Sequence, residues 1–228
     1  MNKYTKQEVA SKIDHAVLKP EYTDQDVREH AEMCIRNGVF SMCVKPCHVE
    51  LAAGLLKESQ VKVSCVLSFP HGADTSAVKA AQAKKAIEDG VDEIDMVMNI
   101  GKFMSGDYVY VIEDIKSVVD VARPSGVKVK VIQESGYLSL EQVARACELS
   151  HEAGADFVKT STGFGPGSAT REIIGVMIKT VGDKMSVKPS GGIRTWEKAV
   201  EYLDMGADRL GVGSTEAVLS GAESKDGY

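Results

Sequence analysis

The sequence predicts a single (β/α)8 barrel, and three observations support this fold. First, a phrase recurs in which a helical stretch ends at a glycine and a short β-rich run follows: NGVFSMCV from Asn37, DGVDEIDMVM from Asp89, SGVKVKVI from Ser125, AGADFVKT from Ala153 and MGADRLGVG from Met205. Second, glycine after a helix is the usual left-handed C-cap, and each run has the length and the Val and Ile content of a buried strand. Third, the 228 residues suit one barrel, and no Ser/Pro-rich linker interrupts the repeats.

The other elements complete eight βα units. Three further strands are predicted in SKIDHAVL from Ser11, VKVSCVLSF from Val61 and KMSVKPS from Lys184. Amphipathic helices are predicted between strands in SAVKAAQAKKAIED from Ser76, DYVYVIEDIKSVVDVA from Asp107 and SLEQVARACELSHEA from Ser139. Ser139 and Glu141 suit an N-cap and a first-turn acid. We expect one domain over residues 1–228, with a short N-terminal helix and a flexible C-terminal tail at 221–228. A doubly wound open sheet is the alternative.

Charge and composition point to a small-molecule partner. The net charge of −6 gives no attraction to nucleic acid or to an anionic membrane. The N-terminal segment is too polar for a secretory signal and no apolar run is long enough to span a membrane, so a cytoplasmic location is expected. The five cysteines are an odd number, which favours reduced thiols. Cys43, Cys47 and His48 lack the second half of a zinc ligand set, so no metal site is expected.

The barrel prediction turns polar residues at the ends of strands into candidates, because active sites in this fold lie at the carboxyl ends of the strands. These residues are Asp14, His15, Cys43, Lys45, Ser68, Asp95, Asn99, Glu134, Lys159, Lys188 and the segment 211–214.

Lys159 is the strongest candidate nucleophile. It ends the sixth predicted strand, where burial and a like charge from Lys188 on the neighbouring strand are both expected to lower the pKa of its amine. Asp95, in the otherwise apolar strand EIDMVMN, is placed to offset the charge of Lys188 and to carry protons to a substrate imine. Two plainer readings stay open: Lys159 as a surface lysine, and Asp95 with Lys188 as a buried salt bridge.

Glycine-rich turns follow the last three predicted strands. They are Ser161-Thr162-Gly163, Ser190-Gly191-Gly192 and Gly211-Val212-Gly213-Ser214, with Arg194 nearby. Loops in these places often bind phosphate through backbone N–H groups. A reactive amine beside a phosphate site indicates a phosphorylated sugar or aldehyde that forms a Schiff base and undergoes carbon–carbon cleavage.

Four motifs then become recognisable: SFPHGAD from Ser68, DEIDMVMNIG from Asp92, FVKTSTGFG from Phe157 and VKPSGGIR from Val187. With the terminal tyrosine they resemble the deoxyribose-phosphate aldolase family, class I aldolases with a TIM-barrel fold, and the likeness runs from Lys12 to the C-terminus. The resemblance implies reversible cleavage of 2-deoxy-D-ribose 5-phosphate into D-glyceraldehyde 3-phosphate and acetaldehyde, without metal or organic cofactor. It also implies a role in deoxyribonucleoside catabolism and makes a homodimer plausible.

The resemblance assigns roles to individual residues. Lys159 matches the Schiff-base lysine, Asp95 the proton-shuttling acid, Lys188 the lysine that lowers the pKa of the nucleophile, and Tyr228 a tail tyrosine that transfers a proton at the enamine carbon. The expected substrate-binding residues are Asp14, Cys43, Thr160, Gly163, Gly191, Gly192, Gly211, Gly213 and Ser214. Neither Asp14 nor Cys43 is expected to be essential.

Two departures from the family pattern concern the phosphate site. Phe164 stands where some members have a lysine, and Gly213-Ser214 stands where some have two serines. Both changes remove donors, so phosphate affinity and the use of non-phosphorylated aldehydes are in question. Lys45 is a candidate for compensating charge.

Two alternatives to the aldolase remain. One is a phosphate-binding isomerase or epimerase in which Asp95 abstracts a proton and no covalent intermediate forms. The other is a catalytically silent barrel that binds a phosphosugar or another protein as a regulator.

Overall fold

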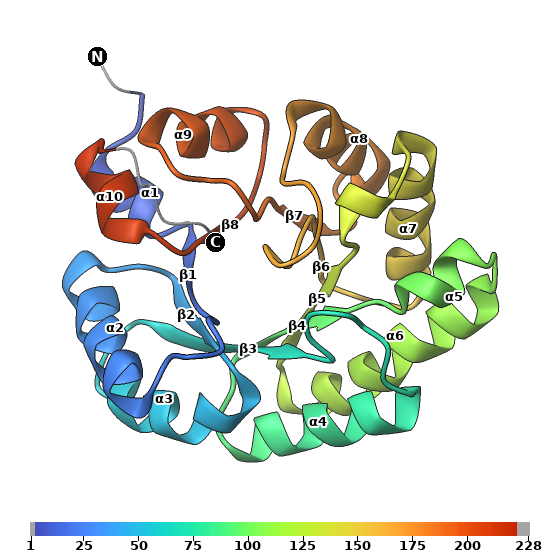
Figure 1. The fold of residues 1–228 in the computed structure, drawn as a ribbon, viewed down its shortest axis with the longest axis horizontal. Helices are drawn as coiled ribbons and strands as arrows, with labels where there is room; N and C mark the ends of the chain where they lie inside the picture. The colour runs from blue at the N-terminus through green and yellow to red at the C-terminus, as the bar shows by residue number, and fades with distance from the viewer. Residues whose placement is uncertain (1–2, 223–228) are drawn as a thin grey trace.

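In a computed structural model the chain is described over residues 3–222, and in this range eight strands form one sheet that curves into a barrel inside a ring of helices (Figure 1). The strands are β1 Ile13–Val17, β2 Ser41–Val44, β3 Lys62–Leu67, β4 Glu93–Val97, β5 Lys128–Ile132, β6 Phe157–Lys159, β7 Ser186–Lys188 and β8 Leu210–Val212. Every predicted strand is therefore found.

The sheet closes almost completely on itself. Its order is β7-β6-β5-β4-β3-β2-β1-β8, and all seven neighbouring pairs are parallel. The two end strands, β7 and β8, meet through an isolated bridge between Ser190 and Gly211 and a hydrogen bond of 2.8 Å from Gly211 N to Pro189 O. The barrel prediction is confirmed, and the open sheet is not what the chain forms.

Helices cover the outside of the barrel (Figure 1). They are α1 Lys6–Ala10, α2 Asp24–Asn37, α3 Val49–Leu56, α4 Ser76–Glu88, α5 Ile100–Met104, α6 Tyr108–Ala122, α7 Leu140–Glu152, α8 Arg171–Val181, α9 Trp196–Asp204 and α10 Thr215–Ser220, with 3-10 turns at Pro46–His48, Arg123–Ser125 and Ser135–Tyr137. The predicted cap is confirmed, because Ser139 forms a capping box with Gln142 at the start of α7 and Glu141 lies in the first turn. Within residues 3–222, no helix has both the length and the apolar character needed to cross a membrane.

The recurring phrase has a clear structural basis. Its glycine closes the helix, as Gly38 does for α2 with φ +62° in the left-handed region. In three phrases an aspartate follows two residues later and clamps the new strand to the one before it. Asp92, Asp156 and Asp208 each donate their backbone N–H to a carbonyl of the preceding strand and accept that same residue's N–H on the side chain, at 2.8 to 3.0 Å. The phrase thus fixes where each of these strands begins.

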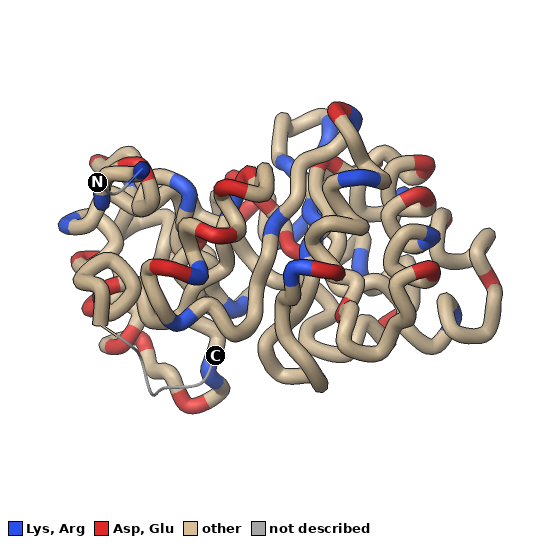
Figure 2. The backbone as a smooth tube through the Cα atoms, turned by 90° about the horizontal axis from the view of Figure 1, so that it is seen from above, with Lys and Arg blue, Asp and Glu red and all other residues tan. Residues whose placement is uncertain are grey.

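Side chains alternate between the two faces of each strand. Those that point outward, including Ile13, Met42, Ile94, Val131 and Val158, are buried under the helices in one large hydrophobic core. Those that point inward are mostly polar or charged, apart from a small apolar cluster of Ala16, Leu18, Cys43 and Val66, against which Phe69 packs. The inside of the barrel is therefore the place to look for chemistry. In the view of Figure 2, Lys and Arg positions are interspersed with Asp and Glu positions along the backbone.

A buried ion pair ties the outer helices to strand β4. Lys79 of α4 donates to Asp114 of α6 at 2.5 Å and to the carbonyl of Val97 at 2.9 Å. Both side chains are fully buried. This contact holds the carboxyl end of β4 in place, and β4 carries Asp95.

Candidate active site

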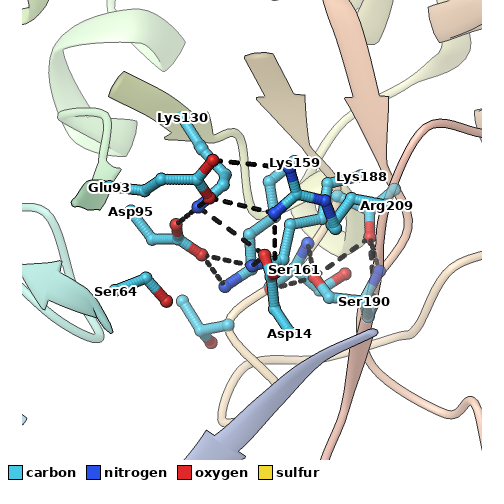
Figure 3. Close-up of polar contacts among 12 residues, drawn as sticks. Asp14, Ser64, Glu93, Asp95, Lys130, Lys159, Ser161, Lys188, Ser190 and Arg209 are labelled. Carbon is cyan, nitrogen blue, oxygen red and sulfur yellow. Dashed lines mark hydrogen bonds and ion pairs between the residues drawn. The ribbon is translucent and has the colours of Figure 1, made fainter. Parts of the chain in front are cut away.

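Seven ionisable side chains meet inside the barrel (Figure 3). Three are carboxylates and four are cations, and each comes from the inward face of a strand or from the residue just before one. They are Asp14, Glu93, Asp95, Lys130, Lys159, Lys188 and Arg209, each no more than 6% exposed. Such a group is stable only when every charge has partners, so the contacts among these side chains decide what the site can do.

Asp95 lies at the centre of this cluster. Its Oδ2 atom accepts from Lys159 Nζ at 2.9 Å and from Lys188 Nζ at 2.7 Å, while Oδ1 accepts from Lys130 Nζ at 2.6 Å. One carboxylate oxygen therefore bridges the two lysines that end β6 and β7. The predicted grouping of Asp95, Lys159 and Lys188 is found in the structure.

Asp14 supports Lys188 from the other side. Its Oδ2 atom lies 2.5 Å from Lys188 Nζ, and its Oδ1 atom accepts from Ser41 Oγ at 2.7 Å and from Arg209 Nη1 at 2.8 Å. Lys188 thus has two carboxylates, whereas the only carboxylate that Lys159 contacts among the described residues is Asp95. The two amines are not equivalent.

A lower layer of charges lies under these residues. Glu93 contacts Lys130 at 2.6 Å and Arg209 at 3.0 Å, and the Arg209 guanidinium stacks on the Phe40 ring at 3.3 Å from its centroid. This layer fixes Lys130 and Arg209, which in turn hold Asp95 and Asp14.

The surroundings set the charge states of the supporting groups. Burial alone would raise the pKa of Asp95, but the ammonium groups of Lys130, Lys159 and Lys188 outweigh it and hold that pKa well below its usual range. The same balance of burial against Lys188, Lys130 and Arg209 lowers the pKa of Asp14. Burial would lower the pKa of Lys130, but Asp95, Asp14 and Glu93 raise it overall. When all seven groups are charged, four cations face three carboxylates, so the cluster carries one excess positive charge.

The loops after β6 and β7 are joined by hydrogen bonds. The Thr160 hydroxyl donates to Ser190 O at 2.8 Å and accepts from Ser190 N at 2.8 Å, while Ser190 Oγ donates to Ser161 O at 2.6 Å. The Thr160 hydroxyl is therefore engaged with the protein, and its predicted substrate contact stays a prediction. The Ser161 hydroxyl is buried and has no hydrogen-bond partner among the described residues.

Three of the glycines predicted to bind substrate, Gly191, Gly192 and Gly211, lie where a side chain would be strained or obstructed. Gly191 and Gly192 have φ of +81° and +76°, and a Cβ on Gly192 would lie 2.9 Å from Ser168 Cβ. A Cβ on Gly211 would lie 2.6 Å from Ser190 Cβ. The loop after β7 thus packs closely against the loop after β6 and against β8, and Gly211 N already donates to Pro189 O.

Other predicted residues have different places. Cys43 faces the barrel interior, and burial raises the pKa of its thiol. His15 points outward, away from the site, and its ring nitrogens contact Thr215 and His30 at 2.8 Å each. Tyr228 lies outside the described residues.

Lys45 does not stand free at the mouth of the barrel. Its ammonium donates to the carbonyl oxygens of Lys19, Pro20 and Tyr22 at 3.0 to 3.1 Å, so it holds the loop after β1. Asn99 caps α5 by accepting from Lys102 N at 3.0 Å. Neither side chain has the arrangement of a phosphate ligand.

The remaining candidates are spread around the carboxyl ends of the strands. Arg194 is exposed in the loop after β7, and Ser68 N, directly after β3, donates to Gln82 Oε1 at 2.9 Å. All five cysteines are free thiols, and over residues 3–222 no group of three or more metal-ligating side chains is found.

The sequence interpretation missed Lys130, Glu93 and Arg209. A signal was present, because KVKVI places two lysines in alternation in a strand and EIDMV does the same with two acids. In each pair the period of two predicts that both side chains share a face, and Asp95 had already been assigned to the interior. Arg209 gave a weaker signal, since it precedes its strand.

The comparisons with known proteins agree with this geometry. Residues 8–218 match the model of the DeoC/LacD family aldolases. A deoxyribose-phosphate aldolase of Thermococcus gammatolerans is 48% identical over 96% of this chain and 98% of its own. One of Clostridium perfringens is 48% identical over 98% of this chain and 99% of its own.

Solved structures give the same result. A putative deoxyribose-phosphate aldolase from Coccidioides immitis has a TM-score of 0.92 at 34% identity, over 95% of this chain and 86% of its own. A deoxyribose phosphate aldolase from Aeropyrum pernix, described as a tetramer, has a TM-score of 0.89 at 30% identity, over 95% of this chain and 91% of its own.

Proposed function

The chain belongs to the DeoC/LacD family of aldolases, and we propose that it reversibly cleaves 2-deoxy-D-ribose 5-phosphate into D-glyceraldehyde 3-phosphate and acetaldehyde through a Schiff base on Lys159. The observation that carries the assignment to Lys159 is its contact set. The Lys159 amine is buried and contacts the Oδ2 atom of Asp95, which Lys188 also contacts. The cluster that contains it has four cations and three carboxylates. A carboxylate in direct contact with the amine is placed to take part in the proton transfers of imine formation.

The chemistry follows from these positions. The Lys159 amine adds to the aldehyde carbon of the open-chain sugar, and loss of water gives an iminium ion. That ion accepts the electrons of the C2–C3 bond as it breaks, while the C3 hydroxyl loses its proton and glyceraldehyde 3-phosphate leaves. The enamine then takes a proton at C2, and water releases acetaldehyde and the free amine.

Asp95 and Lys188 are placed to move the protons that these steps require. The Asp95 carboxylate contacts Lys159 at 2.9 Å and Lys188 at 2.7 Å, so it holds the two amines side by side, and we propose that protons pass to and from the substrate through this group. Tyr228 is proposed to deliver the proton to the enamine carbon.

The phosphate group is proposed to lie at the ends of β6, β7 and β8, on the other side of the mouth from β4. The positive φ values of Gly191 and Gly192, a backbone conformation that suits close approach to a ligand, support this placement. With Phe164 in place of a lysine, phosphate binding depends on backbone N–H groups more than on charge.

Borohydride trapping tests the proposal. The protein is incubated with acetaldehyde or with the sugar phosphate and reduced, and the adduct is mapped by mass spectrometry. We expect one adduct on Lys159 in the wild type and none in Lys159→Ala, with exposed Lys116→Ala as the control. An unmodified Lys159 in an active enzyme would contradict the mechanism and favour the isomerase alternative, which the comparisons do not support.

Removing the tail from residue 221 tests Tyr228. Turnover is expected to fall while imine formation is retained, and an equal loss of both would contradict the assigned role. The homodimer and the cytoplasmic location stay predictions, to be checked by light scattering and by cell fractionation.

A further inference from the structure

Glu134, in the loop after β5, has a strained backbone. Its φ of 48° and ψ of 58° lie in the left-handed region, which residues with a side chain rarely adopt. Glycine or asparagine would adopt this conformation at lower cost, yet a glutamate stands here. Backbone strain of this kind persists where the surrounding structure enforces it, and it is concentrated at functional sites. The side chain of Glu134 is therefore the part to explain.

Among the described residues, the hydrogen bonds of the Glu134 carboxylate all go to Thr162, and both oxygens take part. It accepts from Thr162 N at 3.2 and 3.3 Å and, through a very short contact, from the Thr162 hydroxyl. Thr162 Oγ1 in turn accepts from Phe164 N at 3.0 Å. Glu134 is 2% exposed and Thr162 is fully buried. Hydrogen bonds to an ionised acceptor are the stronger kind, so this contact fixes the Thr162 turn.

The two loops are matched over several residues. Gln133 N donates to Lys159 O at 3.0 Å, and Ser135 N donates to Thr160 O at 2.9 Å. A Cβ on Gly136 would lie 1.7 Å from Pro166 O, so the two backbones touch. The contacts with the loop after β5 thus fix the backbone conformation of the segment that begins at Lys159.

The turn 161–163 is held by hydrogen bonds to the loops on both sides of it. Ser161 is bound to Ser190 of the β7 loop, and Thr162 is bound to Glu134 of the β5 loop. Between them the buried Ser161 hydroxyl has no partner among the described residues. The Ser161 hydroxyl is therefore available to a group outside the described residues, and it lies in a turn that both neighbouring loops hold in place.

We propose that Glu134 is a positioning residue that acts through Thr162 to hold the turn 161–163 against the phosphate of the substrate, and so sets the preference for the phosphorylated sugar. This rests on the proposed function. The opposite direction is expected if Glu134 acts on the phosphate through its charge, because a carboxylate repels a dianion and its loss would strengthen phosphate binding.

The measured quantity is the ratio of kcat/KM for 2-deoxyribose 5-phosphate to that for 2-deoxyribose. In Glu134→Gln we expect this ratio to fall by about tenfold or more, mainly through KM for the phosphorylated sugar, as loss of a charge-assisted contact implies. Glu152→Gln, on the exposed face of α7, is the matched control and should leave the ratio unchanged.

Two further variants separate position from charge and from folding. Gly165→Ala keeps the carboxylate but displaces it, because the new Cβ would lie 2.8 Å from Glu134 Cδ, and it should lower the ratio as Glu134→Gln does. Thr162→Val should also lower it, and the double variant Glu134→Gln/Thr162→Val should cost no more than the larger single effect.

The outcomes decide the proposal. An unchanged or increased ratio in Glu134→Gln, or additive losses in the double variant, overturns it while the aldolase assignment stands, provided that borohydride still traps an adduct on Lys159. Absence of that adduct in the wild type overturns the proposed function and this inference with it.

Discussion

Lys130→Met tests whether the charges inside the barrel form one coupled unit. Methionine keeps most of the length of the lysine side chain and removes only the ammonium group. That group contacts Asp95 Oδ1 and Glu93 Oε2, both at 2.6 Å, and lies 3.6 Å from Asp14 Oδ2. Its loss leaves Asp95 with two lysines on its other oxygen and Glu93 with Arg209 alone.

The size of the effect follows from full burial of the contact. Removal of one partner from a buried ion pair costs about 3 to 5 kcal/mol, and the remaining cations place this case toward the lower end. For a chain of this length, each kcal/mol lowers Tm by about 2 to 4 °C, so a fall of about 6 to 12 °C is expected.

The pH of the assay matters. Because the pKa of Asp95 is lowered in the folded protein, its contribution to stability is complete at pH values above its pKa in the unfolded chain and is lost on acidification. Because the pKa of Lys130 is raised in the folded protein, its contribution to stability is complete at pH values below its pKa in the unfolded chain and is lost only at strongly alkaline pH. Both contributions are complete at pH 7, where Tm is measured by calorimetry.

Activity gives a second readout. In Lys130→Met, Asp95 loses the cation on its Oδ1 atom, so the carboxylate that contacts Lys159 is no longer held from that side. Borohydride trapping at Lys159 should then be slower, and kcat should fall by more than tenfold. Lys116→Ala is the control, because its pair with Asp120 is half exposed and such pairs contribute about 0 to 1 kcal/mol. A Tm as high as the control's, or an unchanged trapping rate, would refute the coupling.

Three other predictions concern the frame around the site. Asp156→Ala removes the acceptor for Val129 N and should lower the free energy of unfolding by about 1 to 3 kcal/mol in denaturant melts. Asp156→Asn keeps an acceptor oxygen and should lose less stability, and kcat of the folded enzyme should change little in both variants. Lys45→Ala frees three carbonyl oxygens and should lower Tm while KM for the sugar phosphate stays constant; a raised KM would restore its role as phosphate ligand. Burial and then the neighbouring His30 lower the pKa of His15 to about 3, so the unfolded chain takes up a proton as the pH falls below about 6 and the folded one does not. The free energy of unfolding should therefore decrease by up to about 1.4 kcal/mol for each pH unit of acidification below about pH 6. His15→Gln should make this pH dependence shallower.

The sequence predicted the strands and the three central side chains because both depend on local patterns. A glycine that ends a helix and a short apolar run are visible in the chain, and a lysine or aspartate in such a run stands out. Arg209 was missed because it precedes β8, and its role appears only where Glu93 and Asp14 converge on it from other strands. The outward position of His15 could have been read from the period of two, since Asp14 next to it points inward. The contacts of Lys45 lie on backbone carbonyls of another loop, and no side-chain pattern encodes those.

The aspartate clamps connect the stability of the barrel with the placement of its active site. In the three phrases that carry the aspartate, the residue three positions after the clamp is a site residue: Asp95 after Asp92, Lys159 after Asp156 and Gly211 after Asp208. Because each clamp joins a residue one or two positions before its strand to the preceding strand, it also fixes how far along the barrel the site residue three positions later lies. A slip of one residue would turn Lys159 outward into the hydrophobic core. The amino ends of these three strands therefore set the register, and the position three residues after the clamp is free to hold an acid, an amine or a glycine without loss of alignment.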